Sequence, residues 1–205
     1  MQKLHIFIPR FVLGLSIAAL PAAVLGQTNS MPSDSSTAMN SNSTSGSGSV
    51  SASDEKFVRE AAQGGMAEIE LGELATEKAS SEEVKKFGQR MVDDHSKAAD
   101  ELKEIASSKG IQVPDKLSAK DRMTKGRLSK LSGEQFDRAY MSDMVKDHTQ
   151  DVADFKLERS SGTDPDVKHF AAITLPTLQD HLRQAKEIAP TTRNASNNMK
   201  GGGAQ

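Results

Sequence analysis

The sequence predicts an all-α domain of the ferritin-like type, a four-helix bundle in which two antiparallel hairpins are joined by a long crossover. Four long stretches carry apolar residues at alternating spacings of three and four, which is the pattern of amphipathic helices. The connection within each pair of helices is very short, so each pair is expected to form an antiparallel hairpin. The connection between the pairs, 111–132, is long enough to travel the height of the bundle.

The first hairpin is expected to consist of helices over 54–79 and 82–109. Ser53 and Ser81 are expected to cap these two helices, because a serine hydroxyl can accept from the free backbone N–H groups of a first turn. Gly110 follows the second helix and is expected to end it, as glycine often does at helix C-termini.

The second hairpin is expected to consist of helices over 134–160 and 165–189. Gly162 separates them, and Pro190 is expected to end the last helix because proline cannot donate the helical hydrogen bond. A further short helix is expected over 119–131, within the crossover.

The two hairpins echo each other in sequence. Segments 83–106 and 166–189 have the same length, both contain Val-Lys followed two residues later by Phe, and both end in Lys-Glu-Ile-Ala. A duplicated hairpin would leave such an echo, which indicates a bundle with pseudo-twofold symmetry.

Segments of different character surround this helical region. Residues 1–26 combine two basic residues with an apolar run that ends in small residues, which is the pattern of a cleaved signal peptide, with an uncleaved anchor as the alternative. Residues 27–52 and 190–205 are rich in small polar residues and glycine, so we expect a flexible linker and a flexible tail around a domain over 53–189. The mature protein is therefore expected to be periplasmic or secreted, without a transmembrane segment.

The composition limits the kinds of binding and catalytic site that the chain can form. The 205-residue chain has a formal net charge of −2, so no basic surface points to nucleic acid. It contains no cysteine, which excludes disulfides, thiolate metal ligands and thiol nucleophiles. Any metal site has to use histidine and carboxylate ligands.

One Glu or His interrupts the inward-facing stripe of each long helix, near the middle of the first three and about one turn past the middle of the last. These residues are Glu68, His95, His148 and His181, and the rise of an α-helix allows all four to reach one layer of the bundle. Imidazoles and a carboxylate that converge in an apolar core can bind one Zn, Fe, Mn or Cu ion. The alternative is a metal-free hydrogen-bond network in which the four groups satisfy one another.

Carboxylates near these histidines are candidates for a supporting role. Asp94, Asp147 and Asp180 each precede one of the histidines and either orient a histidine on a neighbouring helix or lie at the surface. Asp151, three residues after His148, is expected to hold its second ring nitrogen.

The first helix has two further features near Glu68. Glu70 and Glu73 become alternative ligands if this helix is rotated about its axis. Gly64, Gly65 and Gly72 weaken the helix, and they indicate either a close approach of helices around the site or plain tight packing.

Four runs of sequence resemble the domain of unknown function 4142 family. They are FVREAAQGGMAEIELGELATEKA, VKKFGQRMVDDHSKAADELKEIA, FDRAYMSDMVKDHTQD and FAAITLPTLQDHLRQAKEIA, and the resemblance covers about 54–189. Members of this family are exported bacterial proteins grouped with the ferritin-like fold and often labelled as outer-membrane proteins. The resemblance implies a bundle and export, leaves outer-membrane association open, and implies no established activity.

The ferritin-like group also suggests di-iron chemistry, which uses a Glu-x-x-His pattern on two helices. This chain has Val92 three residues before His95 and Leu178 three residues before His181, so the bridging carboxylates are missing and a mononuclear site is expected.

Three classes of function follow from these features. The chain is a metal-binding module for storage, buffering or stress protection, a non-catalytic envelope interaction protein, or a mononuclear metalloenzyme. An enzyme needs an open coordination position, whereas four protein ligands would fill a tetrahedral shell. The sequence contains no nucleophile motif, phosphate loop or paired acid–base carboxylates, which favours a role other than catalysis.

Overall fold

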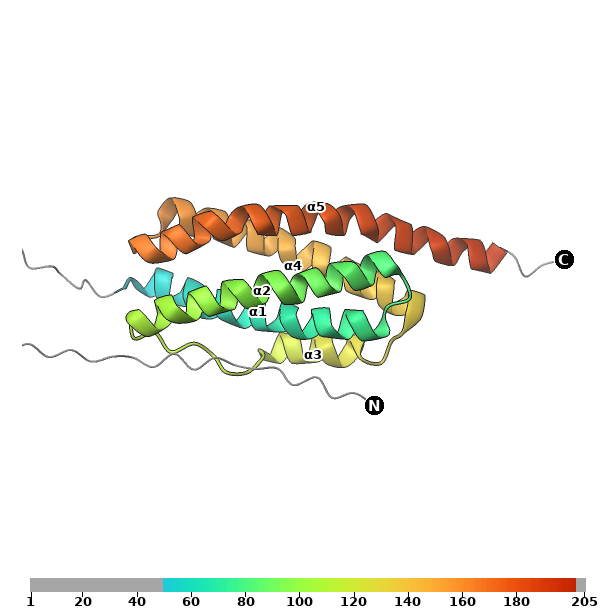
Figure 1. Ribbon diagram of the computed structural model, residues 1–205, viewed down its shortest axis with the longest axis horizontal. Helices are drawn as coiled ribbons and strands as arrows, with labels where there is room; N and C mark the ends of the chain where they lie inside the picture. Colours follow the sequence, from blue (N-terminus) through green and yellow to red (C-terminus); the bar gives the residue numbers. More distant parts are fainter. Residues whose placement is uncertain (1–49, 202–205) are drawn as a thin grey trace, which may run out of the picture. The chain divides into compact units, whose positions relative to one another are not determined.

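Five α-helices follow one another along the part of the chain that the structure describes, and the same part contains no strand. The structure is a computed structural model that describes residues 50–201, with side chains for 50–190 and 192. The predicted signal peptide and nearly all of the predicted linker lie outside these residues. The helices are α1 (Ala52–Lys78), α2 (Glu82–Ser108), α3 (Ala119–Leu128), α4 (Gly133–Ser161) and α5 (Pro165–Gly201) (Figure 1).

The four long helices form two hairpins, as predicted. The most extensive contacts are those of α1 with α2 and of α4 with α5, and smaller contacts join α2 to α5 and α1 to α4. Helices α1 and α5 run in one direction and α2 and α4 in the other (Figure 1). The connection from α2 to α4 therefore returns along the bundle, with α3 packed against α1 and α4. This up-down-down-up order confirms the ferritin-like arrangement.

A buried carboxyl group of the second hairpin forms hydrogen bonds with the turn of the first hairpin. Asp137, near the start of α4, is only 2% exposed. It accepts hydrogen bonds from the Ser80 N–H at 3.1 Å, the Ser80 hydroxyl at 2.6 Å and the Ser81 N–H at 3.0 Å. Asp137 thus satisfies backbone donors at the start of α2 that a helix leaves free.

Asp54, in the first turn of α1, has the same role in the other hairpin. It is fully buried and accepts from the Thr163 hydroxyl and the Asp164 N–H, each at 2.7 Å, at the turn between α4 and α5. The two hairpins therefore clamp each other's turns reciprocally, which fits the pseudo-twofold relation expected from the sequence echo. Sequence reasoning placed Asp54 in a first turn and did not foresee either clamp.

Helix α1 begins two residues earlier than predicted. Ser51, and not Ser53, is its N-cap: the Ser51 hydroxyl accepts from the Asp54 N–H at 3.1 Å. Both serines have the right chemistry for a cap, so the sequence alone did not decide between them.

The prediction that Pro190 ends the last helix was wrong, because α5 continues through it to Gly201. A proline removes one backbone hydrogen bond and crowds the preceding turn, but packing can outweigh that cost. Ala189 and Thr192 are both buried next to Pro190, and the Thr192 hydroxyl donates to the Ala189 carbonyl at 2.9 Å. The segment predicted as a flexible tail thus begins inside α5, whose last part projects beyond the other helices (Figure 1).

The apolar core consists of two clusters, which lie toward opposite ends of the four long helices. The buried members of the first cluster, at the α1–α2 turn, are Leu71, Ala75, Ala79, Val84, Phe87, Met91, Leu128, Phe136, Tyr140, Met141, Met144, Ala185 and Ala189. Those of the second, at the α4–α5 turn, are Phe57, Val58, Leu102, Ala106, Ile111, Val152, Phe155, Val167, Phe170, Ala171, Leu175 and Leu178.

Helices α1 and α2 approach closely where a glycine of one faces a glycine of the other. A Cβ atom on Gly72 would lie 2.6 Å from the Gly88 carbonyl oxygen, and one on Gly88 would lie 2.7 Å from the Ala75 Cβ. Neither position has room for a side chain, so plain tight packing accounts for Gly72.

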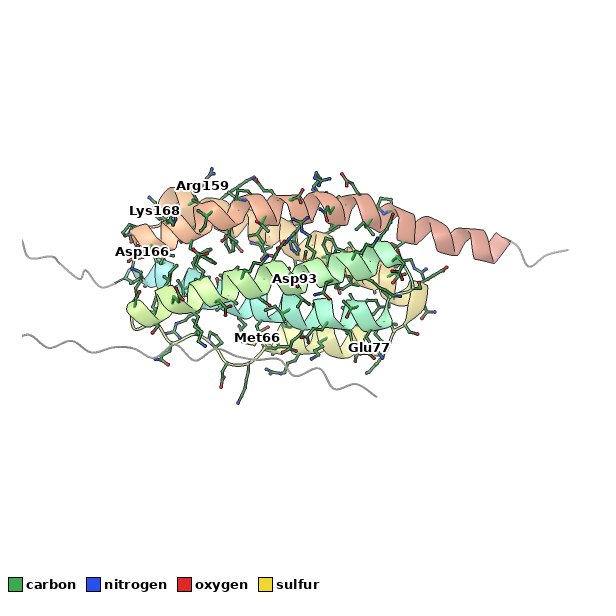
Figure 2. All side chains as sticks on the ribbon, viewed as in Figure 1. Met66, Glu77, Asp93, Arg159, Asp166 and Lys168 are labelled. Atoms are coloured by element: carbon green, nitrogen blue, oxygen red, sulfur yellow. The ribbon has the colours of Figure 1, made fainter. Side chains whose placement is uncertain are left out.

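Charged side chains such as Glu77 and Arg159 are exposed and point away from the bundle (Figure 2). Among the described residues, none of the helices has the length and apolar character needed to span a membrane.

We predict that replacing Asp54 by Asn lowers the free energy of unfolding at pH 7 by about 2–3 kcal/mol, because charged acceptors make strong hydrogen bonds. Burial raises the pKa of Asp54, but the hydrogen bonds from Thr163 and Asp164 outweigh burial and hold the pKa below its ordinary value of 3.8. The stabilisation is therefore complete above about pH 4 and is lost as pH falls through the lowered pKa.

Urea unfolding from pH 2 to 7 measures this dependence. The variant is expected to lose less stability in acid than the wild type, and Asp100→Asn, at an exposed position of α2, serves as the control. Equal acid sensitivity of the wild type and Asp54→Asn would contradict the prediction.

Candidate metal centre

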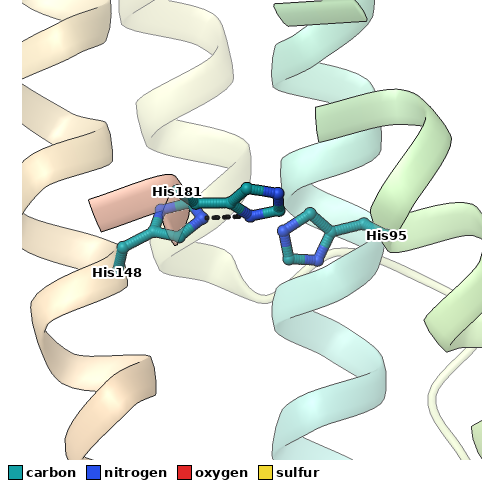
Figure 3. Close-up of side chains that lie close together, drawn as sticks. All are labelled: His95, His148 and His181. Carbon is teal, nitrogen blue, oxygen red and sulfur yellow. Dashed lines mark hydrogen bonds between the residues drawn. The ribbon is translucent and has the colours of Figure 1, made fainter. Parts of the chain in front are cut away.

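The four residues predicted for the site meet in one layer between the two apolar clusters. Glu68 of α1, His95 of α2, His148 of α4 and His181 of α5 have exposed fractions of 5%, 8%, 0% and 0%. On every helix the polar residue separates members of the first cluster from members of the second. The three imidazole rings point toward one another (Figure 3), and one nitrogen of each lies within 4.8 Å of a nitrogen of the others.

The proton on the His148 ring has a defined place. Its Nδ1 lies 3.1 Å from the Met144 carbonyl oxygen and 3.1 Å from Glu68 Oε1. Both oxygens can only accept a hydrogen bond, because burial raises the pKa of Glu68 but the neighbouring histidines outweigh it and keep the carboxyl ionised. Nδ1 of the neutral ring therefore carries the hydrogen, and Nε2 presents a lone pair.

His181 has the opposite tautomer. Its Nε2 lies 2.9 Å from Asp94 Oδ2, a carboxylate oxygen, so this nitrogen carries the hydrogen and Nδ1 presents a lone pair. The His181 Nδ1 and the His148 Nε2 face each other at 3.3 Å, as the dashed line in Figure 3 shows. Two lone pairs thus oppose each other in the centre of the layer.

A proton between the two rings is not available near neutral pH. It would turn one ring into an imidazolium, but burial lowers the pKa of His148 and lowers that of His181 to about 4. Burial lowers the pKa of His95 as well, but the Glu68 charge outweighs it and raises the pKa. Of the three rings, His95 is thus the one whose surroundings favour a proton, and the opposed lone pairs of the other two rings remain without a donor.

Glu68 and His95 are close together but poorly aligned. His95 Nε2 lies 2.6 Å from Glu68 Oε2, an ion-pair distance, yet this nitrogen and the other Glu68 oxygen, Oε1, are buried without a hydrogen bond of good geometry. Such atoms are costly in a protein interior unless another partner takes up their electron pairs.

The preceding aspartates have different surroundings. Asp94 accepts from the His181 ring on the neighbouring helix, which is the supporting contact considered from the sequence. Arg90 then ties Asp94 to Asp180, with distances of 3.1 Å and 2.6 Å to the two carboxylates. Asp180 therefore reaches the layer only through Arg90, a residue that sequence reasoning missed because its partners lie on two helices.

The other carboxylates are less directly involved. Asp147 pairs with Lys120 at 3.4 Å, and Glu70 pairs with Lys125 at 2.7 Å, both of which belong to α3. Glu73 is exposed. The two ion pairs and the exposure of Glu73 place these three side chains outside the layer.

Asp151 does not take the ring nitrogen of His148 that was predicted for it, because Met144 and Glu68 lie at Nδ1 and His181 lies at Nε2. Asp151 nevertheless forms a second group with Glu68 and His148, in which one ligand atom of each lies within 4.8 Å of the others. It thus flanks the layer on the side of Glu68.

Fold and site together define a ferritin-like helical bundle with three histidines and one glutamate buried at its centre. The chain belongs to the family described as "Domain of unknown function (DUF4142)", whose model matches residues 39–188. No curated protein matches the sequence.

Two solved structures are similar in fold. A DUF305 fragment from Deinococcus radiodurans has a TM-score of 0.60 and 17% identity, and the match covers 69% of this chain and 98% of that one. A DUF305 protein from Streptomyces coelicolor has a TM-score of 0.60 and 16% identity, covering 68% and 92%. These likenesses support the helical architecture.

We predict that in the metal-free protein at pH 7 the hydrogen lies on Nδ1 of His148 and on Nε2 of His181. Multiple-bond ¹H–¹⁵N correlation spectra of the imidazole rings measure these tautomers directly. His181 is expected to stay neutral until the pH approaches 4. A hydrogen on Nδ1 of His181 at pH 7 would contradict the geometry described above.

Proposed function

We propose that this chain is an exported protein whose bundle binds one divalent metal ion through His95, His148 and His181, with Glu68 beside them as a charged ligand. The observation that carries the proposal is the pair of opposed lone pairs, 3.3 Å apart, on two rings whose other nitrogens already donate elsewhere. A cation accepts both lone pairs at once, which a neutral hydrogen-bond network cannot do.

The surroundings of the rings suit metal ligands. Histidines that bind metals commonly donate their second N–H to a backbone carbonyl or a carboxylate, which fixes the tautomer. His148 and His181 have these two kinds of partner, in Met144 and Asp94. Three imidazoles with one carboxylate suit Zn, Cu or Fe, and Mn less well. The layer contains a single carboxylate, so the proposed site is mononuclear.

The biological role that we propose is holding a metal ion outside the cytoplasm, for storage, buffering or protection against stress. The signal-peptide pattern over 1–26 supports export. The description of the similar Streptomyces coelicolor structure also calls that protein secreted.

A second candidate is a non-catalytic envelope protein whose polar layer is structural. The 2.6 Å ion pair between Glu68 and His95 favours it, because that pair balances its own charge without a metal. Under this alternative the protein acts through its outer surface, and adding metal leaves its stability unchanged.

We predict one metal ion per chain in the mature protein purified without chelator, and loss of that ion in His148→Ala. Elemental analysis measures the stoichiometry. The matched control is His169→Ala, because His169 lies on α5 but is exposed and outside the cluster. Binding should also raise the melting temperature, since about 2.7 kcal/mol is gained when free metal is a hundredfold above its Kd.

Acid is expected to release the ion as the three imidazoles become protonated. If the wild type takes up no Zn, Fe, Mn or Cu, or if His148→Ala retains the full amount, the metal proposal fails and the structural alternative stands.

A further inference from the structure

A pocket of about 90 Å³ opens beside the histidine layer, and Glu68 and His95 form part of its lining. The pocket lies among α1, α2, α4 and α5, on the side of the layer where the second apolar cluster packs. Most of its wall is apolar, and the larger apolar side chains are Phe57, Leu102, Phe155, Phe170 and Leu178.

Two adjacent glycines of α1, Gly64 and Gly65, also line this pocket. A Cβ on Gly64 would have no neighbour within 4 Å, and one on Gly65 would meet only His95 Nδ1, at 3.9 Å. Packing therefore does not require glycine at either position, in contrast to Gly72. A glycine inside a helix lowers helix stability by about 1 kcal/mol relative to alanine. At these two positions the missing side chains leave space next to His95.

The pocket also has a definite electrostatic character. Its wall contains four side chains with carboxyl groups, Glu60, Glu68, Asp151 and Asp154, and no lysine or arginine. Two buried atoms that lack a well-formed hydrogen bond, Glu68 Oε1 and His95 Nε2, belong to residues of its wall. The carboxyl groups in the wall disfavour the binding of anions. The apolar part of the wall lies next to Glu68 and His95, whose buried atoms lack a well-formed hydrogen bond.

We propose that this pocket binds a small uncharged molecule that has one lone-pair donor atom and presents that atom to the metal ion. The inference rests on the proposed metal site and adds a fifth ligand, on the side of Gly64 and Gly65, to the four protein ligands. An engineered apolar cavity of about 150 Å³ holds benzene, so a 90 Å³ pocket takes roughly four non-hydrogen atoms, with the donor atom of the molecule reaching out of the pocket toward the metal.

The test uses the mature protein loaded with one equivalent of Co²⁺ and titrated with imidazole at pH 8, where imidazole is largely neutral. Visible absorption of the cobalt ion reports the binding. We expect imidazole to bind saturably to the wild-type protein. Azide, an anion of similar length, should bind much more weakly.

Gly64→Leu fills the pocket and should raise the Kd for imidazole about tenfold or more, while Co²⁺ remains bound at one per chain. Gly65→Leu is the second variant, in case the first folds poorly. The matched control is Gly126→Leu, because a Cβ there also has open space but Gly126 lies on α3, outside this pocket.

Each outcome has a distinct meaning. If the wild type holds Co²⁺ but imidazole leaves its spectrum unchanged, or if Gly64→Leu and Gly65→Leu bind imidazole as the wild type does, the pocket inference is overturned and the metal site stands. If the wild type binds no Co²⁺, the proposed function fails and the pocket inference falls with it.

Discussion

The structure depends on one buried layer of four polar side chains between two apolar clusters. Every long helix contributes one of them, so a helix that slipped by one residue would turn its polar side chain about 100° away from the layer. Buried polar groups are costly unless they find partners, and among the described residues these groups have partners only in one another, in Met144 and in Asp94. The layer therefore sets the relative register of the four helices as well as providing the candidate site.

The rest of the fold holds this layer in position. Asp54 and Asp137 clamp the turn of the opposite hairpin, and the carboxyl group of each accepts hydrogen bonds from the residues that lead into a helix. The close contact at Gly72 and Gly88 fixes the spacing of α1 and α2 near Glu68. Arg90, through Asp94, holds the His181 ring from outside the layer. These contacts fix where the three imidazoles meet, and such an arrangement would lower the conformational cost of the ion binding that we propose.

Helical periodicity was sufficient to predict the bundle and the members of the layer, because a stripe of period 3.6 identifies inward positions and helix length gives their height. The topology followed from the lengths of the connections. It could not separate Asp94 from Asp147 and Asp180, since all three precede a histidine and only the packing of neighbouring helices brings one of them to a ring. The buried clamps and the course of α5 through Pro190 also depend on tertiary contacts. The pocket beside Gly64 and Gly65 is an absence of side chains, which a sequence pattern does not distinguish from tight packing.

The central claim is that the opposed lone pairs of His148 and His181 share a cation with His95. Crystals grown with one equivalent of Zn²⁺, measured with X-rays on both sides of the zinc absorption edge, test it most directly. The account predicts a single anomalous peak at about 2.0–2.1 Å from Nε2 of His95, Nε2 of His148 and Nδ1 of His181, the usual zinc–nitrogen distance. An empty layer, or a peak bound only by exposed residues such as His169, would contradict the account.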